Sequence, residues 1–136
     1  MDRPKDSGKR PGRDVRLLIV DDEIGFAEVL CKRMRRRSVE AASAESGDEA
    51  VRLLRREEFD VAIVDLKLQG MNGIEILKVF RLMAPEMPVL MLTGHGSEEA
   101  RDECLKLGAA GYLSKPVEFD RLLDKALELS AGRVRA

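Results

Sequence analysis

Carboxylate, hydroxyl and ammonium side chains follow the short apolar segments of this sequence. Asp21 and Asp22 come after the first segment and Asp65 after a central one, while Thr93 and Lys115 come at the ends of two later ones. If these segments are parallel strands, the side chains meet at the sheet edge where open α/β sheets bind ligands. Carboxylates gathered there repel one another unless positive charge lies among them. Lys115 supplies one such charge, and a hard divalent cation such as Mg²⁺ would supply more.

The reaction that suits this set of side chains is phosphoryl transfer to a carboxylate. An Asp can act as the nucleophile and form an aspartyl phosphate, and the loose transition state needs positioning and charge neutralisation more than covalent help. Lys115 would neutralise one phosphoryl oxygen, the Thr93 hydroxyl would hold another, and Mg²⁺ would bridge a third to the acidic ligands. Asp65 is the best candidate nucleophile because it follows the central segment. A single Asp after a strand is ordinary turn or cap chemistry, so the inference rests on the whole set.

The elements that must position these residues alternate along the chain. The predicted strands are 15–20, 38–44, 59–65, 88–93 and 110–114. After each strand, apolar residues recur at helical spacing. Five strands joined by helices imply right-handed crossovers and a parallel sheet covered on both faces. We therefore predict an α/β fold, a doubly wound five-stranded parallel sheet of order 2-1-3-4-5 in a (βα)₅ alternation.

Local signals place the helices. The first helix is predicted to bury one face, which is made by Phe26, Val29, Leu30 and Met34. Ser46 or Asp48 can cap the second helix, and Ser97 can cap the fourth. The third and fifth helices are predicted at 74–83 and 118–129.

Length and composition indicate one globular domain. The chain has 136 residues, of which 44% are hydrophobic and 36% charged, and its net charge is −1. It has two cysteines far apart, no apolar run of about 20 residues and no signal-peptide segment, which argues against secreted and membrane proteins. The balanced charge argues against a nucleic-acid coat. We expect a flexible tail at 1–14, a domain at 15–130, a tail or linker at 131–136, and a cytoplasmic location.

Four motifs together resemble the receiver domains of two-component response regulators. They are LLIVDDE at the first strand, VAIVDLKLQGMNGIEIL in the middle of the chain, PVLMLTGHG at the fourth strand and GYLSKP at the fifth. The resemblance covers roughly residues 15–130. It implies a flavodoxin-like fold and a bacterial signalling domain that accepts a phosphoryl group from a sensor histidine kinase or a phosphotransfer protein.

Carried over residue by residue, the resemblance implies that Asp65 is the phosphoacceptor. Asp22 would be a direct Mg²⁺ ligand, with Asp21 in the same acidic pocket. Asp65 itself and the backbone carbonyl of Lys67 would complete the protein ligands of the metal.

The resemblance also implies roles for the other strand ends. Thr93 and Lys115 would contact the phosphoryl group, Tyr112 would be the switch aromatic together with Thr93, and the Lys115–Pro116 bond would be cis, in line with the small trans preference of proline. One departure is visible, because the family often has Pro four residues after the acceptor, where this chain has Gln69. That difference bears on the rigidity of the loop and leaves the phosphorylation chemistry in place.

Two further groups of residues have weaker assignments. Lys67 and His95 lie two residues beyond the acceptor and beyond Thr93, so they are candidates to tune the rate of dephosphorylation. Five basic residues lie within 32–37, at the end of the first predicted helix. Cations there complement the helix dipole, and docking of the kinase or an acidic partner is the alternative. No dinucleotide, P-loop, zinc or Gly-x-Ser-x-Gly pattern occurs.

The leading interpretation is a phosphoacceptor domain that catalyses its own phosphorylation and dephosphorylation and is not a turnover enzyme. It would use Mg²⁺, a kinase or phosphotransfer partner and an unknown output partner or output domain, with phosphorylation-dependent dimerisation as an option and no direct contact with nucleic acid or membrane. One alternative is a small phosphotransferase or phosphatase that uses Asp65 on free substrates. The other is a scaffold that is never phosphorylated, against which the intact acidic pocket, Thr93 and Lys115 argue.

Overall fold

The computed structural model describes residues 15–68 and 72–132. The strands are β1 (Val15–Val20), β2 (Val39–Ala44), β3 (Val61–Val64), β4 (Val89–Thr93) and β5 (Gly111–Ser114). The helices are α1 (Ile24–Arg36), α2 (Gly47–Arg56), α3 (Gly73–Met83), α4 (Glu98–Lys106) and α5 (Phe119–Ala131). All strand pairs are parallel and the order is β2-β1-β3-β4-β5, which confirms the predicted doubly wound fold.

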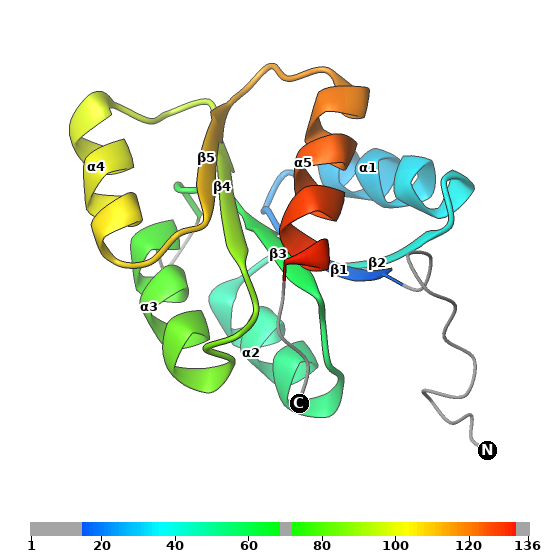
Figure 1. Cartoon of the computed structure of the whole chain (residues 1–136), viewed down its shortest axis with the longest axis horizontal. Helices are drawn as coiled ribbons and strands as arrows, with labels where there is room; N and C mark the ends of the chain where they lie inside the picture. The colour runs from blue at the N-terminus through cyan, green and yellow to red at the C-terminus, as the bar shows by residue number, and fades with distance from the viewer. Residues whose placement is uncertain (1–14, 69–71, 133–136) are drawn as a thin grey trace.

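The sheet separates two hydrophobic cores. Figure 1 shows α1 and α5 on one face of the sheet and α2, α3 and α4 on the other. β3 and β4 are buried along their whole length, as is most of β1, because central strands of a doubly wound sheet are covered on both faces. Successive side chains of each strand point to opposite faces. Leu17 and Ile19 therefore pack in the α1–α5 core, and Leu18 and Val20 in the α2–α3–α4 core.

The local differences from the predictions have simple physical causes. Val29 is 57% exposed rather than buried, because the buried face of α1 is formed by Ala27, Leu30, Cys31 and Met34. β2 begins at Val39 because Ser38 has a φ of 67°, which is left-handed and ends the preceding helix. Of the two predicted caps of α2, Ser46 is the one used, since its hydroxyl accepts the Glu49 N–H.

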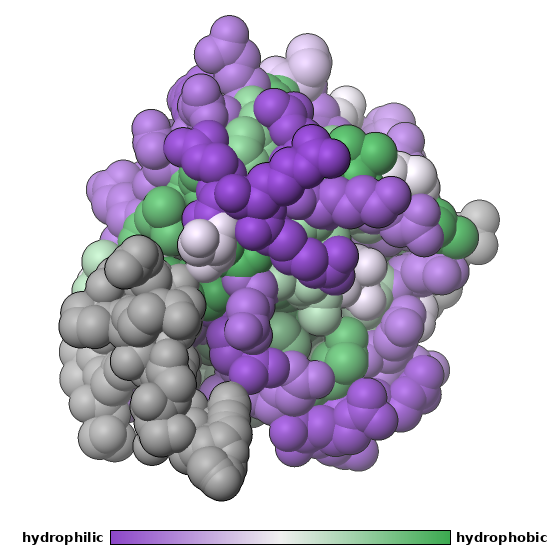
Figure 2. Space-filling view, turned by 90° about the vertical axis from the view of Figure 1, so that its right-hand side faces the viewer, coloured by the Kyte–Doolittle hydropathy of each residue, from purple (hydrophilic) through white to green (hydrophobic). Residues whose placement is uncertain are grey.

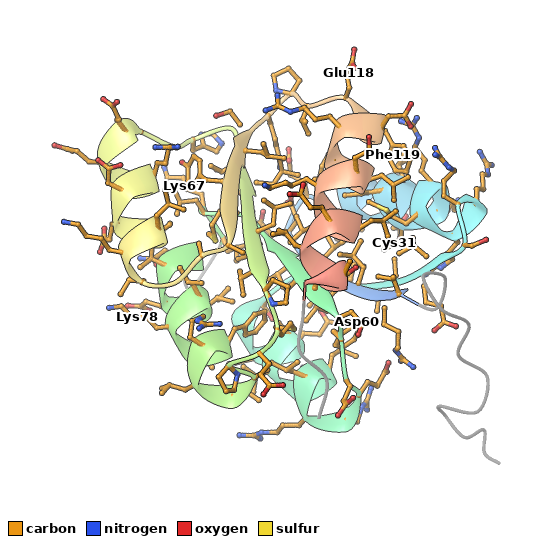
Figure 3. All side chains as sticks on the ribbon, viewed as in Figure 1. Cys31, Asp60, Lys67, Lys78, Glu118 and Phe119 are labelled. Carbon is orange, nitrogen blue, oxygen red and sulfur yellow. The ribbon has the colours of Figure 1, made fainter. Side chains whose placement is uncertain are left out.

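The amino end of the sheet is held by hydrogen bonds, an ion pair and an aromatic contact that all involve Arg16. The buried Asp60 side chain accepts the Arg16 backbone N–H at 2.9 Å, and the Asp60 N–H donates to the Arg16 carbonyl at 2.8 Å. The Arg16 guanidinium pairs with Glu57 and lies 5.8 Å from the ring centre of Phe59. Asp60 and Lys67 are labelled in Figure 3, where they lie toward opposite ends of the sheet. These contacts tie β1 to the segment that connects α2 with β3.

The basic run at the end of α1 makes specific local contacts. The Arg33 guanidinium lies 4.3 Å from the ring centre of Phe119, Arg35 donates to the Ala41 carbonyl, and Arg37 pairs with Asp120 at 3.0 Å. Figure 2 faces this side of the molecule and shows it dominated by hydrophilic side chains. The run therefore fastens α1 to β2 and to α5, in addition to its favourable place at a helix C-terminus.

Some sequence-based expectations lie outside the described residues. These are the tail at 1–14, Gln69 in the loop after β3, and most of the segment 131–136. Within the described ranges, none of the helices has the length and apolar character needed to cross a bilayer.

Candidate functional site

The strand ends bring the predicted site residues together at the carboxyl edge of the sheet. Backbone hydrogen bonds continue one residue beyond the strands. The Asp21 N–H donates to the last carbonyl of β2 at 3.0 Å, the Asp65 N–H to the last carbonyl of β1 at 2.9 Å, and the Lys115 N–H to the last carbonyl of β4 at 2.9 Å. The sheet register therefore sets where these three side chains begin. Lys67, also beyond a strand end, marks this edge in Figure 3.

Three carboxylates and one ammonium group form the centre of the site. Asp21, Asp22 and Asp65 each offer a carboxylate oxygen within 4.8 Å of the others. The Lys115 Nζ donates to Asp21 at 2.9 Å and lies 3.5 Å from an Asp65 oxygen. It also bonds Glu23 at 3.1 Å. One ammonium group thus faces a surplus of negative charge, which is the donor set of a divalent-cation site.

Burial and hydrogen bonding have opposite effects on the pKa values of Asp21 and Lys115 in this cluster. Burial raises the pKa of Asp21, although its hydrogen bonds from Lys115 and from the Glu23 N–H lower it, and the charge of Asp65 raises it further. Burial alone would lower the pKa of Lys115, but its hydrogen bonds to Asp21 and Glu23 and the charges of Asp21 and Asp65 raise it overall. The raised pKa of Lys115 favours its charged form, and this single positive charge is shared by Asp21, Asp65 and Glu23.

Lys115 lies next to a cis peptide bond and against an aromatic ring. The Lys115–Pro116 bond is cis, as the family resemblance implies. The Lys115 Nζ lies 4.3 Å from the ring centre of Phe26 on α1. An aromatic ring supplies negative electrostatic potential without another formal charge, so Phe26 adds to the environment that holds the ammonium group.

Thr93 is buried at the end of β4 and its hydroxyl is engaged. The Thr93 Oγ accepts the His95 backbone N–H at 3.0 Å. The sequence interpretation considered only the His95 side chain, which is exposed and lines the cavity. The backbone contact was missed because any residue type can make it. It connects the β4–α4 loop directly to the Thr93 hydroxyl.

The loop after β3 approaches Asp65 closely. The Lys67 N–H points to an Asp65 carboxylate oxygen at 3.4 Å, and the Gly73 N–H donates to the Leu66 carbonyl at 2.6 Å. A methyl group on Gly73 would overlap the Asp65 backbone carbonyl. Asn72 caps α3 by accepting the Glu75 N–H. The Asn-Gly pair that predicts a turn is therefore also required by close packing against the candidate acceptor.

An open cavity of about 610 Å³ lies over these groups. Its lining residues are Asp22, Glu23, Asp65, Lys67, Leu68, Asn72, Gly94, His95 and Lys115. The sequence interpretation missed Glu23 and Asn72. The signals for both were present, since Glu23 continues the acidic run after β1 and Asn72 begins the helix that follows the acceptor loop. A phosphoryl group entering this cavity meets the Asp65 carboxylate from solvent.

Tyr112, the predicted switch residue, lies beside the site on the other side of β4. It is partly buried against the α2–α3–α4 core. Its hydroxyl oxygen is buried and has no hydrogen-bond partner among the described residues. Burial raises the pKa of Tyr112, and the charges of Cys104 and Asp65 raise it further while Arg101 lowers it.

The model of the response regulator receiver domain matches residues 17–127 of this chain. The chain belongs to the response regulator receiver domain family. Receiver domains are phosphoacceptors of two-component signalling rather than turnover enzymes, and the acidic cluster of this receiver domain is suited to a divalent metal.

Curated relatives include bacterial transcriptional regulators. The receiver domain is 38% identical over 117 residues to the transcriptional regulatory protein ZraR of Escherichia coli K12, covering 84% of this chain and 26% of the relative. It is 36% identical over 118 residues to the response regulator protein PilR of Pseudomonas aeruginosa, covering 87% of this chain and 26% of that protein. The chain thus spans about a quarter of the length of these relatives.

Solved structures agree in fold and in sequence. A CheY-like receiver domain protein from Methanospirillum hungatei JF-1 superposes with a TM-score of 0.84 at 31% identity, covering 87% of this chain and 94% of that one. A response regulator from Burkholderia pseudomallei, solved with a phosphorylated aspartic acid, a calcium ion and citrate, gives 0.80 at 30% identity, covering 87% and 69%. This chain is a receiver domain of a two-component response regulator, and the phosphotransferase and scaffold alternatives are not favoured.

Proposed function

We propose that Asp65 accepts the phosphoryl group in this receiver domain. The observation that carries the proposal is the setting of its carboxylate, which is 5% exposed, lies 3.5 Å from the Lys115 Nζ and opens into the cavity. In the reaction, an Asp65 oxygen forms a bond to phosphorus while the bond from phosphorus to the donor nitrogen breaks. The phosphorylated aspartic acid of the Burkholderia protein supports this chemistry.

The acidic cluster fits Mg²⁺. Its donors are carboxylate oxygens, which Mg²⁺ prefers, and the like charges of Asp21, Asp22 and Asp65 are only partly balanced by Lys115. We assign Asp22 and Asp65 as ligands, with Asp21 in the same pocket and the Lys67 carbonyl completing the set. The bound metal would neutralise phosphoryl oxygens as charge develops. The calcium ion of the Burkholderia protein is consistent with a divalent cation in such a site.

Thr93 and Lys115 hold the remaining phosphoryl oxygens in this proposal. Lys115 already points its Nζ at Asp65, so it neutralises charge without a large movement. The Thr93 hydroxyl accepts the His95 N–H and can at the same time donate its own hydrogen to a phosphoryl oxygen, so a movement of this hydroxyl toward the phosphoryl group carries the bonded loop with it. Phosphorylation therefore changes the β4–α4 loop, and with Tyr112 as the switch aromatic it changes the output surface, including any surface used for dimerisation.

The phosphodonor has a groove available beside the site. An apolar groove between α1 and the start of α5 is lined by Phe26, Val29, Pro116 and Phe119, and Lys115 lines both this groove and the cavity over Asp65. A helix of a histidine kinase or phosphotransfer protein seated there brings a phosphohistidine within reach of the acceptor. Arg33 at the groove edge favours an acidic residue on that partner.

Lys67 and His95 line the open mouth of the cavity. We propose that both tune the lifetime of the aspartyl phosphate, because water must reach the phosphorus in line. The phosphorylated half-life of His95→Ala and Lys67→Ala should differ several-fold from that of wild type, since a positioned hydrogen bond is worth about 1 kcal/mol and 1.4 kcal/mol is tenfold in rate. Equal half-lives in all three proteins would remove both residues from the mechanism.

We further propose bounds for the receiver unit and a reducing cellular compartment for the protein. Residues 15–130 form the receiver unit, and an output domain or partner like those of the longer relatives reads its state. The two cysteines are free and buried, which suits a reducing cytoplasm. The partner kinase supplies the phosphoryl group there.

The proposal is tested by phosphorylating the chain with Mg²⁺ and acetyl phosphate and measuring the intact mass. Wild type should gain one phosphoryl group and Asp65→Asn none. Asp60→Asn is the matched control, because Asp60 is the buried aspartate at the other end of the same strand region, and it should still be labelled. Unchanged labelling of Asp65→Asn would overturn the acceptor assignment. Absence of label in every protein would favour a scaffold, and sustained phosphate release would favour a phosphatase.

A further inference from the structure

Gly96 lies in the β4–α4 loop, at the point where this loop closes over Tyr112. A methyl group on Gly96 would overlap the Tyr112 hydroxyl oxygen and would lie 2.8 Å from the ring carbon that carries it. The same methyl group would lie 3.1 Å from the Thr93 Cγ2. The loop, the threonine and the tyrosine therefore meet at the place where a side chain of residue 96 would begin.

The backbone at this position does not require glycine. Among the described glycines, only Gly108 has a positive φ, of 104°, so an alanine at position 96 is compatible with the main chain. The atom that the methyl group meets first is the far end of a side chain, which can rotate away. Gly94 offers a comparison in the same loop, because a methyl group there makes ordinary contacts with Lys115 at 3.7 and 4.0 Å.

The position of Tyr112 is held by shape rather than by a hydrogen bond. Its hydroxyl is buried without a partner among the residues the structure describes, and a buried polar group without a partner opposes burial. Packing of the ring against the α2–α3–α4 core favours burial. Because the unpaired hydroxyl and the packing of the ring have opposite effects on burial, a small change in free energy is enough to move the Tyr112 side chain.

The hydrogen bond from the His95 N–H to Thr93 connects this element to the site. A phosphoryl group that accepts the Thr93 O–H draws this hydroxyl toward Asp65 while the hydroxyl still accepts the His95 N–H. The loop that carries Gly96 is then shifted, and the space available to Tyr112 changes with it.

We propose that Gly96 is a positioning residue that permits the inward position of Tyr112, and that any side chain at position 96 turns this tyrosine outward. The steric part of the inference is independent of phosphorylation. Its consequence, that a side chain at position 96 uncouples the output surface from Asp65, rests on the proposed function.

The sequence supplies a direct probe, because Tyr112 is the only tyrosine and the chain has no tryptophan. Quenching of tyrosine fluorescence by acrylamide is measured for unphosphorylated wild type, Gly96→Ala and Gly94→Ala. Wild type and Gly94→Ala should be similarly protected, and Gly96→Ala should lose most of that protection, approaching the urea-unfolded chain. Equal protection of Gly96→Ala and wild type would overturn the proposal.

A second variant covers a failure of Gly96→Ala to fold. The same substitution is then made together with Tyr112→Ala, which removes the side chain that the new methyl group would overlap. Recovery of cooperative unfolding in the double variant supports the proposal. Failure of both proteins to fold overturns it, because the contact that matters would then not be Tyr112.

Coupling to the site is measured with Mg²⁺ and beryllium fluoride as a phosphoryl mimic. The tyrosine signal should change in wild type and stay constant in Gly96→Ala, while acetyl phosphate labels both proteins equally. A wild-type-like change in Gly96→Ala would overturn the uncoupling. If no protein is labelled, the phosphoacceptor assignment fails, and the quenching experiment still decides the role of Gly96.

Discussion

The two ends of the sheet carry buried aspartates in opposite electrostatic settings. At the amino end, the Asp60 carboxylate accepts a backbone N–H, and the neighbouring guanidinium of Arg16 is paired with Glu57. At the carboxyl end, Asp21 and Asp65 lie near one another and share the single ammonium group of Lys115. At the amino end, Asp60 and Glu57 each have a hydrogen-bond partner of their own on Arg16, whereas at the carboxyl end Asp21, Asp65 and Glu23 share one ammonium group.

This difference indicates that the two ends of the sheet have different roles. Buried ionised groups stabilise a fold only when they are paired and hydrogen-bonded, which describes the amino end. A surplus of carboxylates is unfavourable until a cation arrives, which describes the carboxyl end. The fold is therefore fastened at one end of its strands and prepared for a metal and a phosphoryl group at the other.

Addition of Mg²⁺ should produce the largest difference between variants of the two ends of the sheet. At a concentration one hundred times the dissociation constant, a ligand that binds only the folded state raises the free energy of unfolding by about 2.7 kcal/mol. Asp21→Asn and Asp22→Asn should reduce this gain, because each removes negative charge from the cluster, while Asp60→Asn should keep it. Urea unfolding with and without Mg²⁺ measures the effect. An undiminished gain in both carboxyl-end variants would place the metal elsewhere.

Removing the amino-end aspartate should produce the next largest effect. Asp60→Ala leaves the Arg16 N–H without its side-chain acceptor, and an unsatisfied buried group lowers the free energy of unfolding by about 1–3 kcal/mol. Phosphoryl labelling of the folded fraction should stay at the wild-type level. Thermal and urea unfolding together with intact-mass labelling check this. A variant with wild-type stability and no label would reverse the assignment of the two ends.

The contribution of Tyr112 to the pH dependence of the free energy of unfolding should appear only above pH 10. The pKa of Tyr112 is raised above 10.0 by burial, so above that pH the folded state binds more protons than the unfolded state. The free energy of unfolding should therefore be unaffected by this group below pH 10.0 and should fall above it, by at most about 1.4 kcal/mol per pH unit. Tyr112→Phe should remove this part of the slope. Identical slopes in the two proteins would show that the hydroxyl titrates normally.

The smallest predicted changes in the free energy of unfolding concern two glutamates, one at each end of the sheet. Glu23 is mostly exposed and bonds Lys115 at 3.1 Å, so Glu23→Gln should change the free energy of unfolding by less than about 0.5 kcal/mol. Glu57 is less exposed and holds Arg16, so Glu57→Gln should lower it by about 1 kcal/mol. Paired urea titrations measure both changes. A larger loss in Glu23→Gln would mean that the carboxyl end also contributes to stability.

Much of the carboxyl end can be predicted from the sequence. Asp21, Asp65, Thr93 and Lys115 follow apolar segments, and parallel strands carry whatever follows them to one edge. That reasoning needs only strand order and direction, which the alternation of strands and helices supplies. The same reasoning gives the two-faced packing of the sheet.

The remaining contacts cannot be predicted from the spacing of apolar residues, because they depend on how individual groups lie in three dimensions. The pairing of Arg16 with Asp60 joins residues 44 positions apart, and the contact of Gly96 with Tyr112 depends on how closely one loop approaches one strand. Val29 was misplaced because a helical face can be shifted by one residue without changing the apolar spacing. The hydrogen bond from the His95 backbone N–H to Thr93 cannot be predicted from residue type, because the donor is a main-chain group.

The alternation of side chains along β5 separates Tyr112, the proposed switch aromatic, from the groove proposed for the phosphodonor. Tyr112 packs in the core formed with α2, α3 and α4, while its neighbour Leu113 packs in the core formed with α1 and α5, where the groove beside Lys115 lies. Substitutions that alter recognition on one face therefore leave packing on the other face largely untouched. Under the proposed function, changes in the choice of phosphodonor and changes in the output therefore fall in different layers of the molecule.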